Sequence, residues 1–199
     1  MLRIGITGGI GCGKTTVCKI FEILEIPVYY ADERAKYLMT NNKEIINKIE
    51  NIFGKKSYLE NGQLNRKHIA EIAFIDQHKL EILNKTIHPA VKKDFLNWVK
   101  DQEAPYIIKE AALLFETSSY KDLDLNILVT APLNIRIQRV MMRDNTDRDS
   151  VLNRVKNQMP EEEKIKLADF IINNDGNHYL IKQVLDLDKK FKEINEEIR

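Results

Sequence analysis

Near its amino terminus the chain carries the sequence Gly8-Gly9-Ile10-Gly11-Cys12-Gly13-Lys14-Thr15. This stretch fits the pattern G-x-x-x-x-G-K-[ST] of a phosphate-binding loop. Residues 2–7 before it form a short apolar run typical of a buried strand, and residues 16–24 after it carry apolar side chains at helical spacing. A strand, a glycine-rich loop and a helix in this order are the context that the motif requires. We therefore predict that the loop binds the phosphates of a nucleotide.

The residue types in this loop match the chemistry of a triphosphate. Glycine has no Cβ, so the loop can adopt positive φ angles and bring its N–H groups close to an anion. The helix that follows adds the positive end of its dipole. Lys14 can place its charge on the β- and γ-phosphates, and the Thr15 hydroxyl can bind Mg²⁺. The loop residues predicted to bind ATP are Gly9, Gly11, Cys12, Gly13, Lys14, Thr15 and Thr16.

Composition excludes several classes of partner. Among the 199 residues, 31 Lys and Arg nearly balance 30 Asp and Glu, so no overall field favours nucleic acid or an anionic membrane. The apolar runs are much shorter than a membrane span, and we expect no secretory segment. Cys12 and Cys18 fall within one loop and helix and are typical of reduced thiols. We expect a cytoplasmic protein; its oligomeric state stays open, with a monomer favoured.

Short apolar runs alternate with helical patterns along the chain. The predicted strands are residues 2–7, 26–30, 106–110, 125–129 and 170–172. Such alternation is typical of a parallel α/β sheet wrapped by helices, here with five strands.

The long stretch between the second and third predicted strands is almost wholly helical in pattern. Asn41 or Asn42 can cap one helix and Asn65 another, and Pro89 suits the first turn of a further helix. The stretch is too long for a simple crossover. We therefore predict a helical insertion that covers the mouth of the sheet.

Asp32 follows the second predicted strand directly. Ligands of open α/β sheets bind at the carboxyl ends of the strands, so this carboxylate could accept a proton from a substrate hydroxyl. An alternative is that Asp32 caps a helix over residues 33–39.

His88, which precedes Pro89, could contact a substrate, although a structural histidine is the more common outcome.

Arginines cluster in the charge-rich stretch of residues 139–149. Arg139 and Arg143 lie four residues apart and so share a helix face, and Arg148 follows. Guanidinium groups match phosphate oxygens well, and a mobile segment here would suit a lid that closes over ATP. The alternative is a solvated face on which these arginines pair with Asp144 and Asp147.

Several motifs in this order resemble those of the dephospho-CoA kinases over almost the whole chain. Besides the phosphate loop they are Tyr30-Ala31-Asp32, Ile87-His88-Pro89, Leu113-Leu114-Phe115-Glu116, Arg143-Asp144 and residues 168–176. The resemblance implies a P-loop kinase fold and ATP-dependent phosphorylation of the ribose 3′-hydroxyl of dephospho-CoA, which gives coenzyme A. The sequence differs from the family pattern at three positions. Tyr30 stands where an aspartate is usual, Ala112 replaces a proline, and Thr15 replaces a serine.

The resemblance also implies roles for residues and for parts of the chain. It makes Asp32 the catalytic base and gives Lys14, Arg139 and Arg143 the neutralisation of phosphate charge. It implies a nucleotide-binding core of residues 1–32, 105–142 and 168–199, a helical substrate domain of residues 33–104 and a lid of residues 143–167. The remaining predicted contacts are Thr7, His88 and Leu114 with substrate and Arg148 with ATP.

The motifs leave two other classes of P-loop protein to consider. A shikimate- or nucleoside-type kinase would share the loop, but a shikimate kinase needs a glycine-rich substrate loop in mid-chain, where Gly54 and Gly62 are the only glycines between residues 13 and 176. A GTP-binding switch protein would need N-K-x-D, and residues 84–87 (Asn-Lys-Thr-Ile) lack the aspartate.

Overall fold

The computed structural model describes residues 1–198 and divides the chain into two compact units. One unit comprises Met1–Tyr30 and the chain from Gln102 onward, and the other comprises Ala31–Asp101. The second unit is thus inserted into the first between two strands of its sheet.

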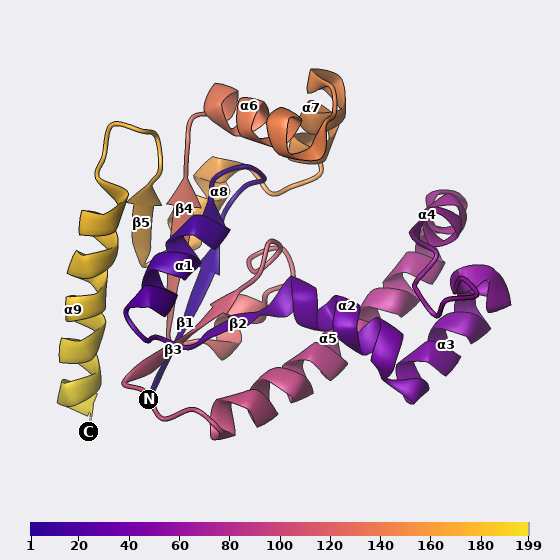
Figure 1. Ribbon diagram of the computed structural model, residues 1–199, viewed down its shortest axis with the longest axis horizontal. Coiled ribbons are helices and arrows are strands. Elements are labelled where there is room, and N and C mark those ends of the chain that lie inside the picture. Colours follow the sequence, from indigo (N-terminus) through magenta and orange to yellow (C-terminus); the bar gives the residue numbers. More distant parts are fainter. Residues whose placement is uncertain (199) are drawn as a thin grey trace. The chain divides into compact units, whose positions relative to one another are not determined.

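The first unit is built on a parallel sheet (Figure 1). Its strands in chain order are β1 (Leu2–Thr7), β2 (Val28–Tyr30), β3 (Tyr106–Glu110), β4 (Leu125–Thr130) and β5 (Phe170–Asn173). They lie in the order β2-β3-β1-β4-β5, and every neighbouring pair is parallel. The predicted five-stranded parallel α/β fold is therefore confirmed. The phosphate loop follows the carboxyl end of β1. Because β1 is the middle strand, the loop lies near the centre of the end of the sheet where the strands finish.

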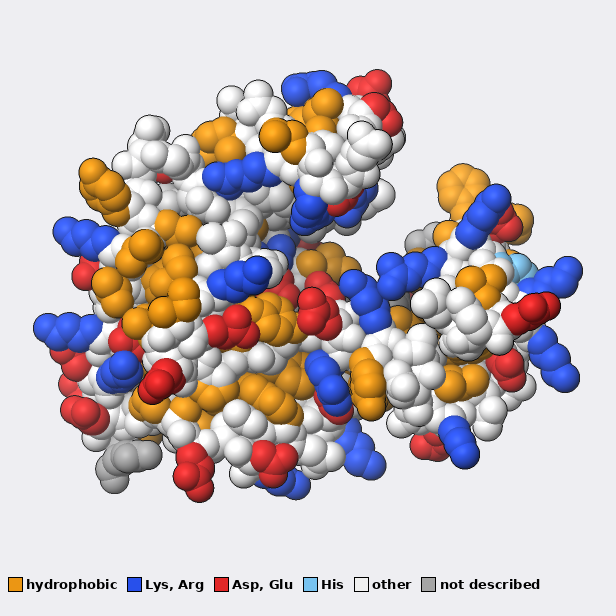
Figure 2. Space-filling model, viewed as in Figure 1, with side chains coloured by type: hydrophobic (Ala, Val, Ile, Leu, Met, Phe, Trp, Pro, Cys, Tyr) orange, Lys and Arg blue, Asp and Glu red, His pale blue; other side chains and the backbone are white. Residues whose placement is uncertain are grey.

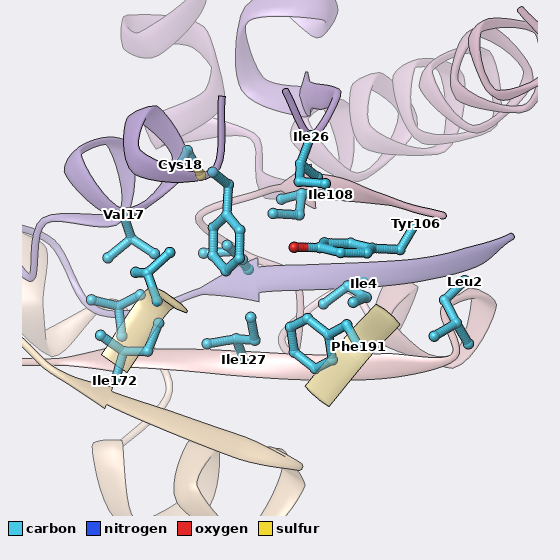
Figure 3. Close-up of a cluster of buried hydrophobic side chains, with 14 of the residues drawn as sticks. Leu2, Ile4, Val17, Cys18, Ile26, Tyr106, Ile108, Ile127, Ile172 and Phe191 are labelled. Carbon is cyan, nitrogen blue, oxygen red and sulfur yellow. The ribbon is translucent and has the colours of Figure 1, made fainter. Parts of the chain in front are cut away.

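The helices of this unit are α1 (Lys14–Ile23), α6 (Leu133–Asp144), α7 (Arg148–Lys156), α8 (Glu161–Leu167) and α9 (Leu180–Ile198). Of these, α1 and α9 pack on the strands, whereas α6 and α7 pack on one another. Apolar side chains of α1 and α9 meet those of the strands in one cluster, shown in Figure 3, which includes Ile4, Val17 and Phe191. Within it the Tyr106 hydroxyl donates to Asp188 Oδ1 at 2.7 Å. Burial of these side chains is the main force that fixes β1 and α1, and hence the loop between them.

The second unit is helical, with α2 (Ala31–Asn41), α3 (Lys43–Phe53), α4 (Arg66–Ile75) and α5 (Gln77–Lys100). It has its own apolar core, made of Leu38, Ile45, Ile49, Phe53, Ile69, Ala73, Leu83 and Ile87. The predicted caps form: Asn42 accepts hydrogen bonds from the N–H groups of Glu44 and Ile45, and Asn65 accepts from that of His68. No helix within residues 1–198 is long and apolar enough to span a membrane.

The structure corrects one local prediction and adds a helix that the sequence did not reveal. Pro89 does not begin a helix but lies inside α5, because apolar residues on both sides of it, Ile87 and Val91, pack in the same core. Residues 148–156, at and after the end of the charge-rich stretch, received no helix prediction, and they form α7. Asp147 caps this helix and Val151 packs against α6.

Charged side chains of both signs are distributed over the face shown in Figure 2. This mixture agrees with the near balance of basic and acidic residues in the sequence. A surface without one dominant sign is poorly suited to attracting a polyanion over a long distance.

Candidate active site

The phosphate loop follows β1 and needs its glycines for steric reasons. Gly11 and Gly13 have φ angles of 79° and 95°, in the left-handed region that glycine favours. A Cβ on Gly9 would collide with the Arg136 guanidinium, and one on Gly13 would collide with the Asn174 amide. The loop is therefore packed closely against other chain segments, so a larger residue at Gly9 or Gly13 would displace the Arg136 or Asn174 side chain.

The loop leads directly into the start of α1, where Lys14 is the first helical residue. Gly13 at the N-cap supplies no side-chain acceptor, so the N–H groups of the first turn have no cap that competes with an anion. Lys14 folds back over the loop and donates from Nζ to the Gly8 carbonyl at 3.0 Å. Thr15 and Thr16 are both exposed.

Arg139 of α6 lies beside this loop. Its Nη2 is 3.4 Å from Asn174 Oδ1, and Asn174 Nδ2 donates to the Cys12 carbonyl at 2.8 Å. Arg139 Nη1 is buried and has no hydrogen-bond partner among the described residues. It lies 3.9 Å from where a Cβ of Gly13 would be. An unpaired cationic donor next to the loop is an arrangement that a phosphate oxygen would complete.

The other two predicted arginines lie on the exposed side of this region. Arg143, at the end of α6, makes two hydrogen bonds of 2.7 and 3.1 Å with Asp144, and Arg154 of α7 donates to the same carboxylate at 2.7 Å. These hydrogen bonds, that from Arg143 above all, hold the pKa of Asp144 well below its ordinary value. Arg148 begins α7 and is exposed. In this structure Arg143 thus makes the pairing expected for a charged surface, and its contact with phosphate stays a prediction.

Cys12 is buried beneath the loop, and this burial raises the pKa of its thiol, with Lys14 acting in the opposite direction. The thiol is therefore neutral at ordinary pH. This state agrees with a small loop residue rather than a nucleophile.

The predicted substrate residues lie in both units. Thr7 is buried at the end of β1, where its hydroxyl is 3.4 Å from the Ala112 carbonyl, and Leu114 is fully buried next to Gly5. Asp32 and His88 belong to the second unit, in α2 and α5. Because α2 begins at Ala31, Asp32 lies inside its first turn and does not precede it as a cap. The contacts of these four residues with substrate stay predictions.

Three residues around the loop escaped the sequence analysis. Arg136 donates from Nε to the Ile10 carbonyl at 3.0 Å, and Gln158 accepts from the Ile10 N–H at 2.8 Å. Asn174, already described, is the third. Each binds backbone atoms of a loop more than a hundred residues away, so no local pattern could reveal the contact. Residues 168–176 did contribute to the family resemblance, and this was the only signal for Asn174.

A central β1, a glycine loop packed against α6 and a parallel sheet together define the P-loop nucleotide-binding class of protein. Comparisons narrow this class. A family model described as dephospho-CoA kinase matches residues 2–179. The dephospho-CoA kinase of Bacteroides fragilis (strain YCH46) is 36% identical over 187 residues, which are 94% of this chain and 91% of that protein.

Comparison with solved structures supports the same family. A crystal structure from Thermus thermophilus superposes with a TM-score of 0.84 at 33% identity, covering 95% of this chain and 96% of that one. The dephospho-CoA kinase from Campylobacter jejuni gives a TM-score of 0.71 at 28% identity, with 97% and 98% covered. The chain belongs to the dephospho-CoA kinase family, as its motifs predicted. It is accordingly a phosphotransferase that uses ATP.

Proposed function

We propose that this protein transfers the γ-phosphoryl group of ATP to the ribose 3′-hydroxyl of dephospho-CoA, giving coenzyme A and ADP in the last step of coenzyme A biosynthesis. The identity of the acceptor substrate rests on the family match over residues 2–179. The loop supports the phosphoryl donor, because its glycines, Lys14 and the unpaired Nη1 of Arg139 converge on a place suited to a triphosphate.

Asp32 is the proposed base. It follows β2 with only Ala31 between them, so the chain carries it out from the carboxyl edge of the sheet. As the 3′-oxygen attacks the γ-phosphorus, its proton passes to the Asp32 carboxylate and ADP leaves with the electrons of the broken P–O bond. Lys14 and Arg139 stabilise the charge that develops on the transferred group and on ADP. Arg143 and Arg148 are further proposed contacts with phosphate.

Mg²⁺ is part of this proposal. The exposed Thr15 hydroxyl at the start of α1 is a suitable hard oxygen ligand. Glu110, which ends β3 beside Ile6 of β1, is a candidate for the role that Walker-B carboxylates have elsewhere. Within residues 1–198 no group of three or more His, Cys, Asp or Glu could hold a metal ion. We expect Mg²⁺ to accompany ATP, where it would supply positive charge to the phosphates with Thr15 as a protein ligand.

A coupled assay for ADP formation tests the proposal. Purified protein with MgATP is offered dephospho-CoA, shikimate or a set of nucleosides at equal concentration. We expect dephospho-CoA to be the preferred acceptor and mass spectrometry to show a product heavier by one phosphoryl group. Faster turnover of shikimate or a nucleoside would contradict the proposed function.

A further inference from the structure

Ile10, in the middle of the phosphate loop, is held through both of its backbone polar groups. Its N–H donates to Gln158 Oε1 at 2.8 Å, and its carbonyl accepts from Arg136 Nε at 3.0 Å. These partners come from α6 and from the connection between α7 and α8, which are distant in sequence. The peptide groups on both sides of Ile10 are thereby fixed in orientation.

Arg136 is itself firmly placed. Its side chain is only 7% exposed and makes an ion pair of 2.6 Å with Glu161 at the start of α8. A Cβ on Gly11 would collide with the Arg136 carbonyl oxygen, just as one on Gly9 would meet the guanidinium. Arg136 therefore packs directly behind the loop over several residues.

Gln158 reaches the loop from a stretch that is anchored to the rest of the unit. The next residue, Met159, donates its N–H to Glu116 Oε1 at 3.2 Å. Lys164 of α8, whose side chain is 2% exposed, lies with Nζ 2.7 Å from the same oxygen. A buried ammonium group depends strongly on such a partner, so this ion pair holds the chain from Met159 to Lys164 in place.

We propose that Gln158 is a positioning residue for the triphosphate of ATP, acting through the Ile10 peptide. Gln158 and Arg136 bind the loop backbone. They are held in place in turn, because Glu161 pairs with Arg136 and Glu116 binds the residue after Gln158. Because the Ile10 peptide is fixed before nucleotide arrives, the remaining N–H groups of the loop keep the orientation that phosphate binding needs. This inference rests on the proposed function and adds a residue that does not touch the reacting atoms.

The test compares Gln158→Leu with Asn157→Leu, which removes an amide from the exposed neighbouring residue. Loss of one backbone-orienting hydrogen bond should raise the KM for ATP about tenfold in Gln158→Leu. The KM for dephospho-CoA and kcat at saturating ATP should stay within about twofold of wild type. An ATP KM equal to that of Asn157→Leu, or an equal loss for both substrates, would overturn the proposal.

Binding of inorganic tripolyphosphate by calorimetry gives a readout independent of the acceptor. Its affinity should fall by about the same factor in Gln158→Leu and stay unchanged in Asn157→Leu. An unchanged affinity in both variants would count against the positioning role even if the acceptor proved not to be dephospho-CoA. The two proposals can therefore fail separately.

Hydrogen exchange in the wild-type protein settles the question should Gln158→Leu fail to fold. Without nucleotide, the Ile10 amide should exchange at least about a hundredfold more slowly than in an unstructured peptide, since its acceptor lies on an anchored segment. Exchange at the rate of an unstructured peptide would mean that Gln158 does not hold the loop, and would refute the inference.

Discussion

Arg139 Nη1 is buried without a hydrogen-bond partner among residues 1–198. A buried donor without an acceptor destabilises the fold by roughly 1–3 kcal/mol, whereas a phosphate oxygen in reach turns the same donor into a strong, charge-assisted contact. With the proposed phosphate contact, fold stability and affinity for ATP would make opposite demands on this residue.

The substitution Arg139→Met tests this opposition. We expect kcat/KM for ATP to fall by about 10²–10³, because the proposed charge contact with the transferred phosphates would be lost. The melting temperature of the free protein should be no lower than that of wild type, since the unpaired donor is removed. Steady-state kinetics and thermal unfolding measure the two effects. Arg154→Met, which removes an exposed arginine bound to Asp144, is the control and should leave kcat/KM nearly unchanged.

Asp32→Asn addresses the proposed base. The amide cannot take up the proton of the substrate hydroxyl, so kcat should fall by about 10²–10⁴ while ATP binding stays nearly intact. Single-turnover kinetics and calorimetry with ATP separate the two quantities, and Glu33→Gln on the same turn is the matched control. A folded Asp32→Asn enzyme with near-normal turnover would remove Asp32 from the mechanism.

At the level of elements, the sequence predicts best what depends on local chemistry. Buried apolar runs identified all five strands, and Asn42 and Asn65 marked the starts of α3 and α4 because a capping side chain acts on its own turn. Pro89 shows the limit of such reasoning, since packing by distant residues keeps α5 continuous through a residue that disfavours helix interiors. The phosphate loop was evident for the same local reason, whereas Arg136 and Gln158 contact it only once the chain has folded.

Pro89→Ala should make α5 more stable. Alanine restores an N–H donor and removes the ring's clash with the preceding turn, which together outweigh the greater freedom of the unfolded chain. We expect the free energy of unfolding to rise by about 1–2 kcal/mol. Urea titration followed by the fluorescence of Trp98, the protein's only tryptophan and itself in α5, measures this change. A lower midpoint than that of wild type would show that the proline is favourable in its place.

The anchored stretch from Gln158 to Lys164 also bears on the proposed lid of residues 143–167. Its contacts with Ile10 and Glu116 belong to the same unit as the sheet. We expect any closing motion to lie within residues 143–157, N-terminal to that anchor.

For the whole molecule, the division into two units has consequences for folding. The inserted unit has its own apolar core, and Arg34 of α2 binds Asp94 of α5 with hydrogen bonds of 2.8 and 2.7 Å. A fragment of residues 31–101 should therefore be helical and melt cooperatively, although at a lower temperature than the full chain because so small a core is marginal. Circular dichroism of the fragment tests this expectation, and the spectrum of an unstructured peptide would contradict it.

Nucleotide should stabilise the whole protein measurably. At a concentration of MgATP one hundred times its Kd, mass action contributes about 2.7 kcal/mol, which corresponds to a rise in Tm of roughly 5–10 °C for a chain of this size. Scanning calorimetry measures the shift. At the same MgATP concentration Lys14→Ala should lose most of it, and an equal shift in that variant would contradict the proposed role of Lys14 in ATP binding.

Both thiols of the chain are buried, and that of Cys12 is also uncharged under the loop. Alkylating reagents and oxidants can therefore reach this sulfur only during brief openings of the local backbone. The rate at which the Cys12 thiol is labelled therefore reports how often those openings occur. Saturating nucleotide should lower this labelling rate. In a cell, the supply of substrate would by the same means shield the enzyme from chemical damage.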